Sequence, residues 1–135
     1  MPILLKSETL EVTEERDIVT VRQAVRRVSL EIRLSLVDQT KVITAASELA
    51  RNLLIYGGGG EVVLEQLQEG ARQGVRVHFV DEGPGIENIE VALRDGYTSG
   101  GGMGLGLGGA KRLVNEFELV SAPGKGTRIT ITRWK

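Results

Sequence analysis

Two polar residues in the segment SELARNLLIY are spaced so that they can act together. Glu48 and Asn52 are four positions apart, which places them about one turn apart on the same side of a helix. A glutamate can accept a proton, and an asparagine oxygen can bind Mg2+, a cation that prefers oxygen ligands and keeps several waters. The pair predicts either proton transfer beside a metal ion or simply a solvated helix face.

A second candidate is the hexapeptide DEGPGI, residues 81–86, at the end of a predicted strand. Asp81 precedes Gly83 and Gly85 there, so its carboxylate is an acceptor on a tight turn whose backbone is accessible. Such an acceptor can take a hydrogen bond from an exocyclic amine, a group that adenine carries. The alternative interpretation is an ordinary acidic turn.

A third candidate is SGGGMGLGLGGAKRLVNE, residues 99–116, in which seven of the first eleven residues are glycine. Glycine is the costliest residue to order, so such a run is favoured where the backbone itself must approach a ligand. Backbone N–H groups ahead of a helix can bind phosphate, whereas the alternative is a flexible linker. A P-loop is absent, because the one Gly-Lys pair, Gly124-Lys125, lies in a predicted turn. A dinucleotide fingerprint does not fit either, because it follows the first strand of a βαβ unit, whereas these glycines follow a predicted hairpin.

Hydrophobic periodicity predicts the elements that position these residues. Residues 7–13 alternate and favour an edge strand. Asp17 is the predicted N-cap of a first helix, and a second helix is predicted from about residue 37 to residue 56, where GGGG ends it. Both helices have apolar stripes that step by three and four residues. The expected buried positions are Ile18, Val21, Val25, Val28 and Ile32 in the first helix, and Val42, Ala45, Ala46, Leu49 and Leu53 in the second.

Two hairpins are predicted in the rest of the chain. The predicted strands are residues 61–69 and 75–82, around a loop of about five residues (GARQG), and residues 117–122 and 127–134, around PGKG. A short helix is favoured over residues 87–96, and another helix over about 104–116. Strands grouped in hairpins predict a mixed, mainly antiparallel sheet covered by helices on one face. The expected fold is a two-layer α/β sandwich forming a single domain over residues 1–135.

The composition limits the classes of function. The chain has 135 residues, of which 41% are hydrophobic and 26% charged, as is usual for one globular domain. A net charge of −1 gives no basic surface for a nucleic acid or a membrane. The sequence has no cysteine and one histidine, His78 on a predicted strand, which excludes disulfides and histidine-rich metal sites. No apolar segment approaches membrane-spanning length, and we expect a cytoplasmic protein.

Taken together and in this order, the motifs resemble the nucleotide site of the GHKL superfamily of ATPases and kinases. The matching motifs are E-x-x-x-N at Glu48 and Asn52, D-x-G-x-G-I at 81–86, G-x-G-L-G-L at 102–107, and Gly126-Thr127 before the last strand. The length and the segments VDQTKVITAASELARN, DGYTSGGGMGLGL and AKRLVNEFEL are similar to the anti-sigma-type serine/threonine kinases, and among these to the switch kinases of the stressosome. The resemblance extends from about residue 17 to residue 134.

The resemblance implies a Bergerat-type ATP-binding fold and a protein serine/threonine kinase that uses ATP and Mg2+. It implies that Glu48 is the general base and that Asn52 binds Mg2+. Asp81 would accept a hydrogen bond from the adenine amine, while backbone groups and packing supply the other nucleotide contacts. Those contacts are assigned to Gly83, Gly85, Ile86, Gly102, Met103, Gly104, Leu105, Gly106, Leu107 and Thr127. No lysine lies in the G-x-G-L-G-L motif, residues 102–107 (the glycine segment), so the cation for the γ-phosphate is unassigned among Arg51, Lys111 and Arg112.

The implied substrates are STAS-domain proteins of a stressosome, whose phosphorylation frees the kinase to activate a downstream regulator. No nucleic acid or membrane is expected as a partner. One alternative is an anti-sigma factor kinase that holds a sigma factor directly. Another is a non-catalytic module that uses ATP only to gate partner binding. Glu48 favours an enzyme over this module, because a pure binder needs no base beside a metal ligand.

Overall fold

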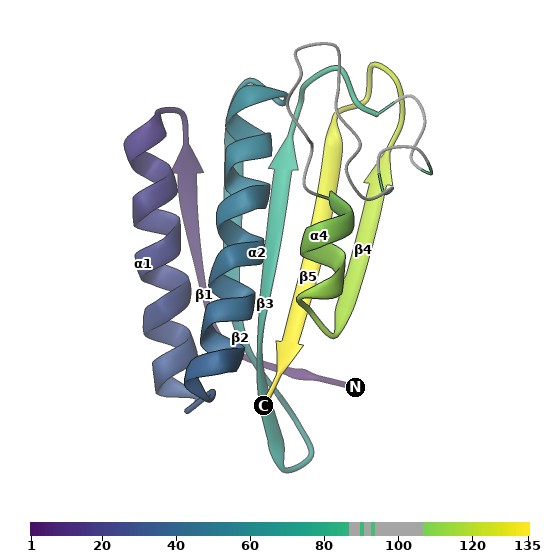
Figure 1. Ribbon diagram of the computed structural model, residues 1–135. Coiled ribbons are helices and arrows are strands. Elements are labelled where there is room, and N and C mark those ends of the chain that lie inside the picture. Colours follow the sequence, from purple (N-terminus) through teal and green to yellow (C-terminus); the bar gives the residue numbers. More distant parts are fainter. Residues whose placement is uncertain (87–89, 91–92, 94–106) are drawn as a thin grey trace.

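The computed structural model consists of one five-stranded sheet with helices on one of its faces (Figure 1). It describes residues 1–86, 90, 93 and 107–135. The strand order is β1-β2-β3-β5-β4, and every neighbouring pair of described strands is antiparallel. The elements are β1 (Ile3–Val12), α1 (Glu15–Glu31), α2 (Leu36–Ile55), β2 (Gly60–Glu69), β3 (Arg72–Asp81), α4 (Leu107–Arg112), β4 (Glu116–Ser121) and β5 (Thr127–Trp134). The predicted two-layer sandwich is confirmed, with β1 at one edge.

The core lies between the sheet and the helices. All ten positions predicted to be buried in the two long helices are buried, because each apolar stripe faces the sheet. The sheet contributes alternate residues of its inner strands to the same core, as expected when one face of a strand is covered. These are Val62, Leu64, Val75, Val77, Phe79, Ile129 and Ile131.

The start of α1 differs from the prediction. The N-cap is Glu14, and Asp17 is the third residue of the helix rather than its cap. The Asp17 carboxylate accepts hydrogen bonds from the backbone N–H groups of Thr13 at 2.9 Å and Glu14 at 3.0 Å. These bonds lower the pKa of Asp17, because they favour its charged form. Asp17 thus acts as the third helix residue of a capping box, whose side chain accepts from the N–H of the N-cap residue.

The β2–β3 connection is shorter than predicted. Glu69 pairs with Arg72, so the turn consists of Gly70 and Ala71 instead of a five-residue loop. Gly70 has φ of 63°, a conformation that glycine adopts without strain and that permits a tight hairpin. Gly74, which was expected in the loop, lies inside β3, where a Cβ would stand 2.5 Å from the Trp134 ring.

The C-terminal helix is also shorter than predicted. α4 ends at Arg112 instead of residue 116, because β4 begins at Glu116. Its last turn is closed by a hydrogen bond from the Leu113 N–H to the Ala110 carbonyl at 3.1 Å, as in a tightened helix end. Residues 104–106 of the predicted helix lie outside the described residues. The short helix expected over 87–96 does so too, apart from residues 90 and 93.

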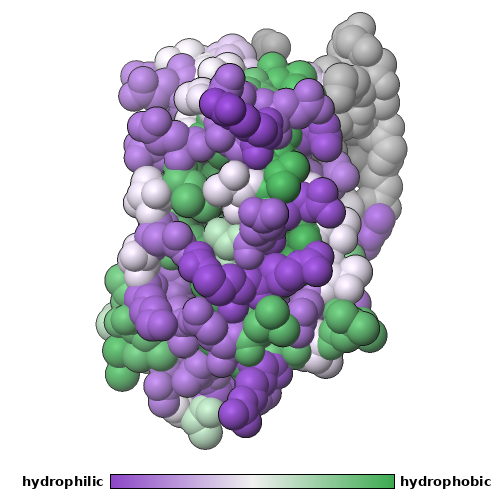
Figure 2. Space-filling view, turned by 90° about the vertical axis from the view of Figure 1, so that its left-hand side faces the viewer, coloured by the Kyte–Doolittle hydropathy of each residue, from purple (hydrophilic) through white to green (hydrophobic). Residues whose placement is uncertain are grey.

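The side of the molecule formed by α1 and β1 is largely hydrophilic, and hydrophobic residues gather toward its lower end (Figure 2). Exposed large apolar side chains occur at the start of β1 and around the turn between α1 and α2. They include Ile3, Leu4, Leu5, Leu30, Leu36 and Val37. Within the described part of the chain, no helix is long and apolar enough to cross a membrane.

Candidate functional site

Three connections meet at one end of the sheet, the upper end in Figure 1: the turn after α2, the loop after β3 and the turn between β4 and β5. Asp81, the last residue of β3, pairs with Thr127, the first residue of β5. Phe79 and Ile129 form the buried pair two positions before and after them. Because strand side chains alternate between faces, Asp81 and Thr127 share the helix-covered face.

Glycines make room for the Asp81 carboxylate. Its Oδ1 accepts a hydrogen bond from the Gly83 N–H at 2.8 Å. A Cβ at Gly57 would stand 2.5 Å from the Oδ2 atom, and a Cβ at Gly83 would stand 2.9 Å from the Gly57 Cα. Such contacts are closer than real Cβ atoms tolerate, so the site needs glycine at both positions. The half-buried carboxylate retains lone pairs on Oδ2 for a ligand donor.

The loop after β3 is fastened to the β4–β5 turn. The Gly124 N–H donates a hydrogen bond to the Pro84 carbonyl at 2.7 Å. Gly85 has φ of 79°, and a Cβ there would stand 2.1 Å from the Ala122 carbonyl oxygen. Both the left-handed conformation and the close approach require glycine. Gly85 therefore allows the backbone of the loop after β3 to lie in direct contact with the backbone of the β4–β5 turn.

Ser121, the last residue of β4, was not singled out from the sequence. Its hydroxyl accepts a hydrogen bond from the Ile86 N–H at 2.8 Å, donates to the Gly126 carbonyl at 3.0 Å and contacts the Thr127 hydroxyl at 2.8 Å. Ile86 is partly buried against the core. The predicted hairpin, with strands 117–122 and 127–134, gave this serine no special position, whereas the observed register pairs Ser121 with Thr127.

Asn52 brings the end of α2 into the same site. Its carbonyl accepts hydrogen bonds from the N–H groups of Tyr56 at 2.9 Å and Gly57 at 3.2 Å, which fixes the turn that contacts Asp81. Its side-chain Nδ2 is buried and has no hydrogen-bond partner in the described part of the chain. A buried donor without a partner needs an explanation; an acceptor atom of a ligand, such as a phosphate oxygen, would pair with it, whereas Mg2+ would take the side-chain oxygen. Glu48, one turn earlier on the same side of α2, is exposed.

The described residues fit a magnesium–nucleotide complex. They provide a carboxylate acceptor, an amide without a partner and glycines that expose backbone. Among the described residues there is no group of three or more histidine, aspartate or glutamate side chains that could hold a metal. Mg2+ is commonly bound by phosphates and waters with one or two protein oxygens, so a single asparagine oxygen is consistent with this.

A family model described as histidine kinase-, DNA gyrase B- and HSP90-like ATPase matches residues 37–135, which include all of the site residues discussed above. The chain belongs to this GHKL family. It is 43% identical over 120 residues to the serine/threonine-protein kinase RsbT of Bacillus subtilis, a match that covers 89% of this chain and 90% of RsbT. It is 31% identical over 97 residues to the anti-sigma F factor of Thermoanaerobacter sp. strain X514, covering 67% of this chain and 66% of that protein. These findings make the chain a GHKL serine/threonine-protein kinase.

Two solved structures share the GHKL fold with this kinase. The RsbU and RsbW domains of Rv1364c from Mycobacterium tuberculosis match with a TM-score of 0.62 and 22% identity, over 98% of this chain and 32% of that longer chain. The SiaB–SiaC complex of Pseudomonas aeruginosa matches with a TM-score of 0.55 and 13% identity, over 98% of this chain and 91% of that chain. At these identities the likeness concerns the fold alone.

The glycine segment of this GHKL kinase is only partly described. Its last residue, Leu107, begins α4 and is 2% exposed within the core, so its side chain anchors the helix that follows the glycines. The other expected nucleotide-binding residues of this segment lie outside the described residues. They are Gly102, Met103, Gly104, Leu105 and Gly106.

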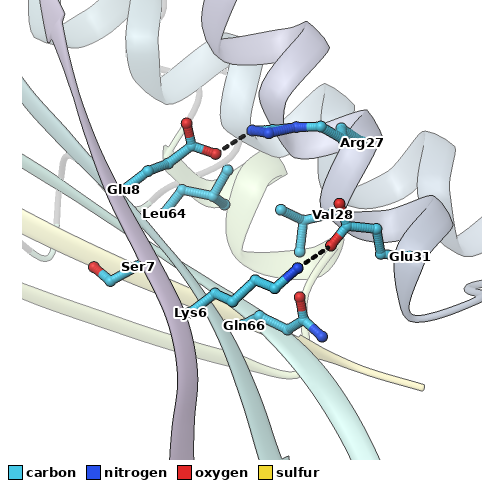
Figure 3. A pocket seen from close by; sticks show the side chains of 8 residues that line it. All are labelled: Lys6, Ser7, Glu8, Arg27, Val28, Glu31, Leu64 and Gln66. Atoms are coloured by element: carbon cyan, nitrogen blue, oxygen red, sulfur yellow. Dashed lines mark hydrogen bonds and ion pairs between the residues drawn. The ribbon is translucent and has the colours of Figure 1, made fainter.

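A separate hollow lies between β1 and α1 (Figure 3). Two ion pairs connect the strand to the helix there, one between Arg27 and Glu8 and one between Lys6 and Glu31 at 3.4 Å. The two basic and two acidic side chains of these pairs balance each other in charge. None of the proposed kinase site residues lines this hollow, whose other lining residues are Ser7, Val28, Leu64 and Gln66.

His78 belongs to a polar cluster on the face of the sheet away from the helices. It contacts the Glu65 carboxylate through Nε2 at 2.6 Å and the Thr130 hydroxyl through Nδ1 at 2.8 Å. Arg76 donates to the same carboxylate at 2.7 Å. Burial alone would raise the pKa of Glu65, but the hydrogen bonds from Arg76 and His78 outweigh it and lower the pKa. The cluster joins β2, β3 and β5 and gives His78 a structural role.

Proposed function

We propose that this GHKL kinase transfers the γ-phosphoryl group of Mg2+-bound ATP to a serine or threonine of a STAS-domain partner, in a stressosome-type switch of bacterial stress signalling. The observation that carries the proposal is the contact between the end of α2 and the end of β3. There the carbonyl of Asn52 holds Gly57, and Gly57 lies against the carboxylate of Asp81. One turn thus joins the candidate metal ligand to the candidate base-recognition residue.

In this proposal Asp81 accepts a hydrogen bond from the adenine amine, and Ile86 packs on the base. Gly83 and Gly85 let the backbone approach the nucleotide, and Thr127 contacts the adenine side of the site. Asn52 offers its side-chain oxygen to Mg2+, which neutralises phosphate charge when bound. The glycine segment, residues 102–107, would contribute backbone N–H groups to the phosphates.

Phosphoryl transfer requires positioning and charge neutralisation more than covalent chemistry by the protein. The partner's hydroxyl oxygen forms the new bond to the γ-phosphorus as the bond to the ADP oxygen breaks. The hydroxyl proton goes to the carboxylate of Glu48. Glu48 suits this step because it is exposed, so a docked protein can reach it, and because it lies on the Asn52 side of α2.

The degree of similarity favours a switch kinase over an anti-sigma factor. The identity to RsbT is 43% over about nine-tenths of both chains, whereas the identity to the anti-sigma F factor of Thermoanaerobacter is 31% over about two-thirds. We therefore propose that STAS-domain scaffold proteins are the substrates, and that phosphorylation releases the kinase to activate a downstream regulator in the cytoplasm. Direct capture of a sigma factor is the second candidate function, because several anti-sigma F factors are similar to this chain.

The decisive experiment uses radiolabelled ATP with purified STAS-domain proteins of the same organism, and mass spectrometry to locate the phosphate. The expected result is transfer to one serine or threonine, abolished when that residue is alanine. ATP binding without transfer to any STAS protein would favour the ATP-gated binding module. A parallel pull-down with sigma factors tests the second candidate, and stable capture of a sigma factor would favour it.

A further inference from the structure

We propose that Ser121 fixes the direction of the Thr127 hydroxyl and thereby makes the site prefer a 6-amino purine to a 6-oxo purine. Ser121 is a positioning residue in this inference, since it acts on the nucleotide only through Thr127. The inference rests on the proposed function, in which Asp81 and Thr127 face the base of ATP.

Only one assignment of protons makes all three contacts of Ser121 hydrogen bonds. The Ile86 N–H can only donate, and the Gly126 carbonyl can only accept. A serine hydroxyl has one proton, so it donates that proton to the Gly126 carbonyl, 3.0 Å away. The contact of 2.8 Å with the Thr127 hydroxyl must then be made with the proton of Thr127. Ser121 thus donates once and accepts twice, and all three of its contacts are satisfied.

This assignment leaves Thr127 without a proton for a ligand. Its hydroxyl hydrogen is directed at Ser121, and only its lone pairs remain available. Asp81 pairs with Thr127 across β3 and β5 on the helix-covered face, where directly opposite side chains are neighbours. An ionised carboxylate is also an acceptor only. The two side chains therefore present acceptors alone to the ligand.

A pair of acceptors distinguishes the two kinds of purine. The 6-amino group of adenine carries two N–H donors, so it can satisfy both side chains. A 6-oxo group is itself an acceptor, and it would leave polar groups of the site unpaired, which is the strongest basis for rejecting a close analogue. Without Ser121 the Thr127 hydroxyl could rotate and donate to a 6-oxo group. The selectivity would then rest on Asp81 alone.

Two consequences of removing Ser121 can be separated. Alanine at position 121 deprives the Ile86 N–H of its acceptor and loosens the loop after β3, which weakens the binding of every nucleotide to the same extent. It also frees the Thr127 hydroxyl, which weakens a 6-amino purine and favours a 6-oxo purine. Only the second effect changes the ratio of the two affinities.

The test measures the affinities of ATP and inosine triphosphate (ITP) by calorimetry, because ITP carries a 6-oxo group and lacks the extra amine of GTP. The wild type should prefer ATP, and S121A should reduce the ATP-to-ITP affinity ratio about three- to tenfold, the size of one hydrogen bond. S121T, which keeps a hydroxyl, should restore the ratio to within about twofold of wild type. As a matched control, S29A removes a buried hydroxyl that bonds the Val25 carbonyl in α1, and should leave the ratio unchanged.

An unchanged ratio in S121A, with both affinities reduced equally, would overturn the inference and leave Ser121 a purely structural residue. If S121A does not fold, T127V decides the matter, because valine has the shape of threonine without the hydroxyl. T127V should leave ITP affinity unchanged or raise it, whereas a fall in ITP affinity would show that Thr127 donates and would overturn the inference. A wild type that binds neither nucleotide would overturn the proposed function itself, a result distinct from ATP binding with an unchanged ratio.

Discussion

The carboxylate of Asp81 lies directly against the main chain of Gly57, so that a Cβ on Gly57 would stand 2.5 Å from both Cγ and Oδ2. The two residues are 24 positions apart in sequence (81 − 57) and are brought together by the end of α2 and the end of β3. Because the Gly57 N–H is held by the carbonyl of Asn52, this contact sets the position of α2 relative to the proposed adenine acceptor.

Substituting Gly57 with alanine should therefore reduce ATP affinity more than it reduces the stability of the fold. The new methyl group would push the Asp81 carboxylate aside, and we expect ATP affinity to fall at least tenfold, as for the loss of a hydrogen bond to a charged group. Calorimetry measures the affinity, and thermal unfolding checks the fold. The control is G58N: Gly58 has φ of 74° with no atom within 4 Å of a Cβ, and asparagine tolerates that backbone region. Equal ATP affinities for G57A and G58N would contradict the prediction.

Asp81→Asn tests the base-recognition residue directly. The asparagine oxygen can still accept the Gly83 N–H bond, so the loop should keep its shape while an NH2 group replaces the second acceptor. Loss of a charge-assisted hydrogen bond should cost about 1.5–3 kcal/mol, one to two decades of ATP affinity. E82Q, at the adjacent exposed carboxylate, is the matched control and should bind ATP normally. A folded D81N protein with wild-type ATP affinity would refute the assignment.

Asn52→Ala should weaken Mg2+-bound ATP far more than metal-free ATP. The substitution removes the proposed oxygen ligand. It also deletes a buried Nδ2 that has no partner among the described residues, so the free energy of unfolding should change little. Nucleotide titrations with Mg2+ and with a chelator measure the difference. Equal losses under both conditions would mean that Asn52 acts on the nucleotide by some route other than the metal.

The Glu65 cluster predicts how stability depends on pH. The pKa of Glu65 is lowered from its ordinary value of 4.5 in the folded protein. The charged carboxylate therefore stabilises the fold above that value, and its contribution is lost as the pH falls below it. E65Q should reduce the free energy of unfolding at pH 7 by about 1–3 kcal/mol. It should also make the free energy of unfolding fall less steeply as the pH is lowered. Urea unfolding between pH 7 and 3 measures both.

The matched control for the Glu65 cluster is E118Q, at an exposed carboxylate on β4. It should leave both the stability at pH 7 and the slope on the acid side close to wild type. A decline in E65Q that runs parallel to that of the wild type below pH 4.5 would show that Glu65 makes no such contribution.

The fold could be predicted from the sequence because its signals are local and periodic. Every position that the apolar stripes of the two long helices predicted to be buried is buried, since a helix face and a core face coincide. The stripes missed four further buried residues of these helices, Ala24, Ser29, Ile43 and Ala50. The errors occur where a tertiary contact, rather than the local sequence, determines which structure a segment adopts. Gly74 looked like a loop residue, but the ring of Trp134 lies over it inside β3. The predicted C-terminal helix was too long because residues from Glu116 pair with β5 instead.

The candidate site likewise has features that the sequence predicts and features that depend on tertiary contacts. Glu48 and Asn52 share a helix face, and Asp81 ends a strand, so both features follow from local spacing. The contact of Gly57 with Asp81 depends on how α2 sits on the sheet, which no spacing encodes. Ser121 matters through three partners, of which Ile86 is 35 residues away, and a lone serine at a strand end gives no sign of them.

The last prediction concerns the reaction itself. Glu48→Gln keeps the length and shape of the side chain but removes its ability to accept a proton. Because Glu48 is exposed on α2, the change should leave ATP affinity and partner binding nearly intact. A positioned base contributes about 10²–10⁴-fold to the rate, so phosphorylation of the STAS partner should slow by that order. Single-turnover transfer of radiolabelled phosphate, with ATP and partner saturating, measures the chemical step apart from binding.

The matched control for Glu48 is T44A, because Thr44 is exposed one turn earlier on the same side of α2 and has no role in the proposed chemistry. T44A should transfer phosphate at the wild-type rate, so a slow E48Q protein beside a fast T44A protein would tie the loss to the carboxylate. A wild-type rate in E48Q would remove Glu48 as the base, since an amide cannot take the hydroxyl proton. In that case the kinase would depend on positioning and phosphate neutralisation, and Asn52 would remain as the α2 residue to which the reaction is sensitive.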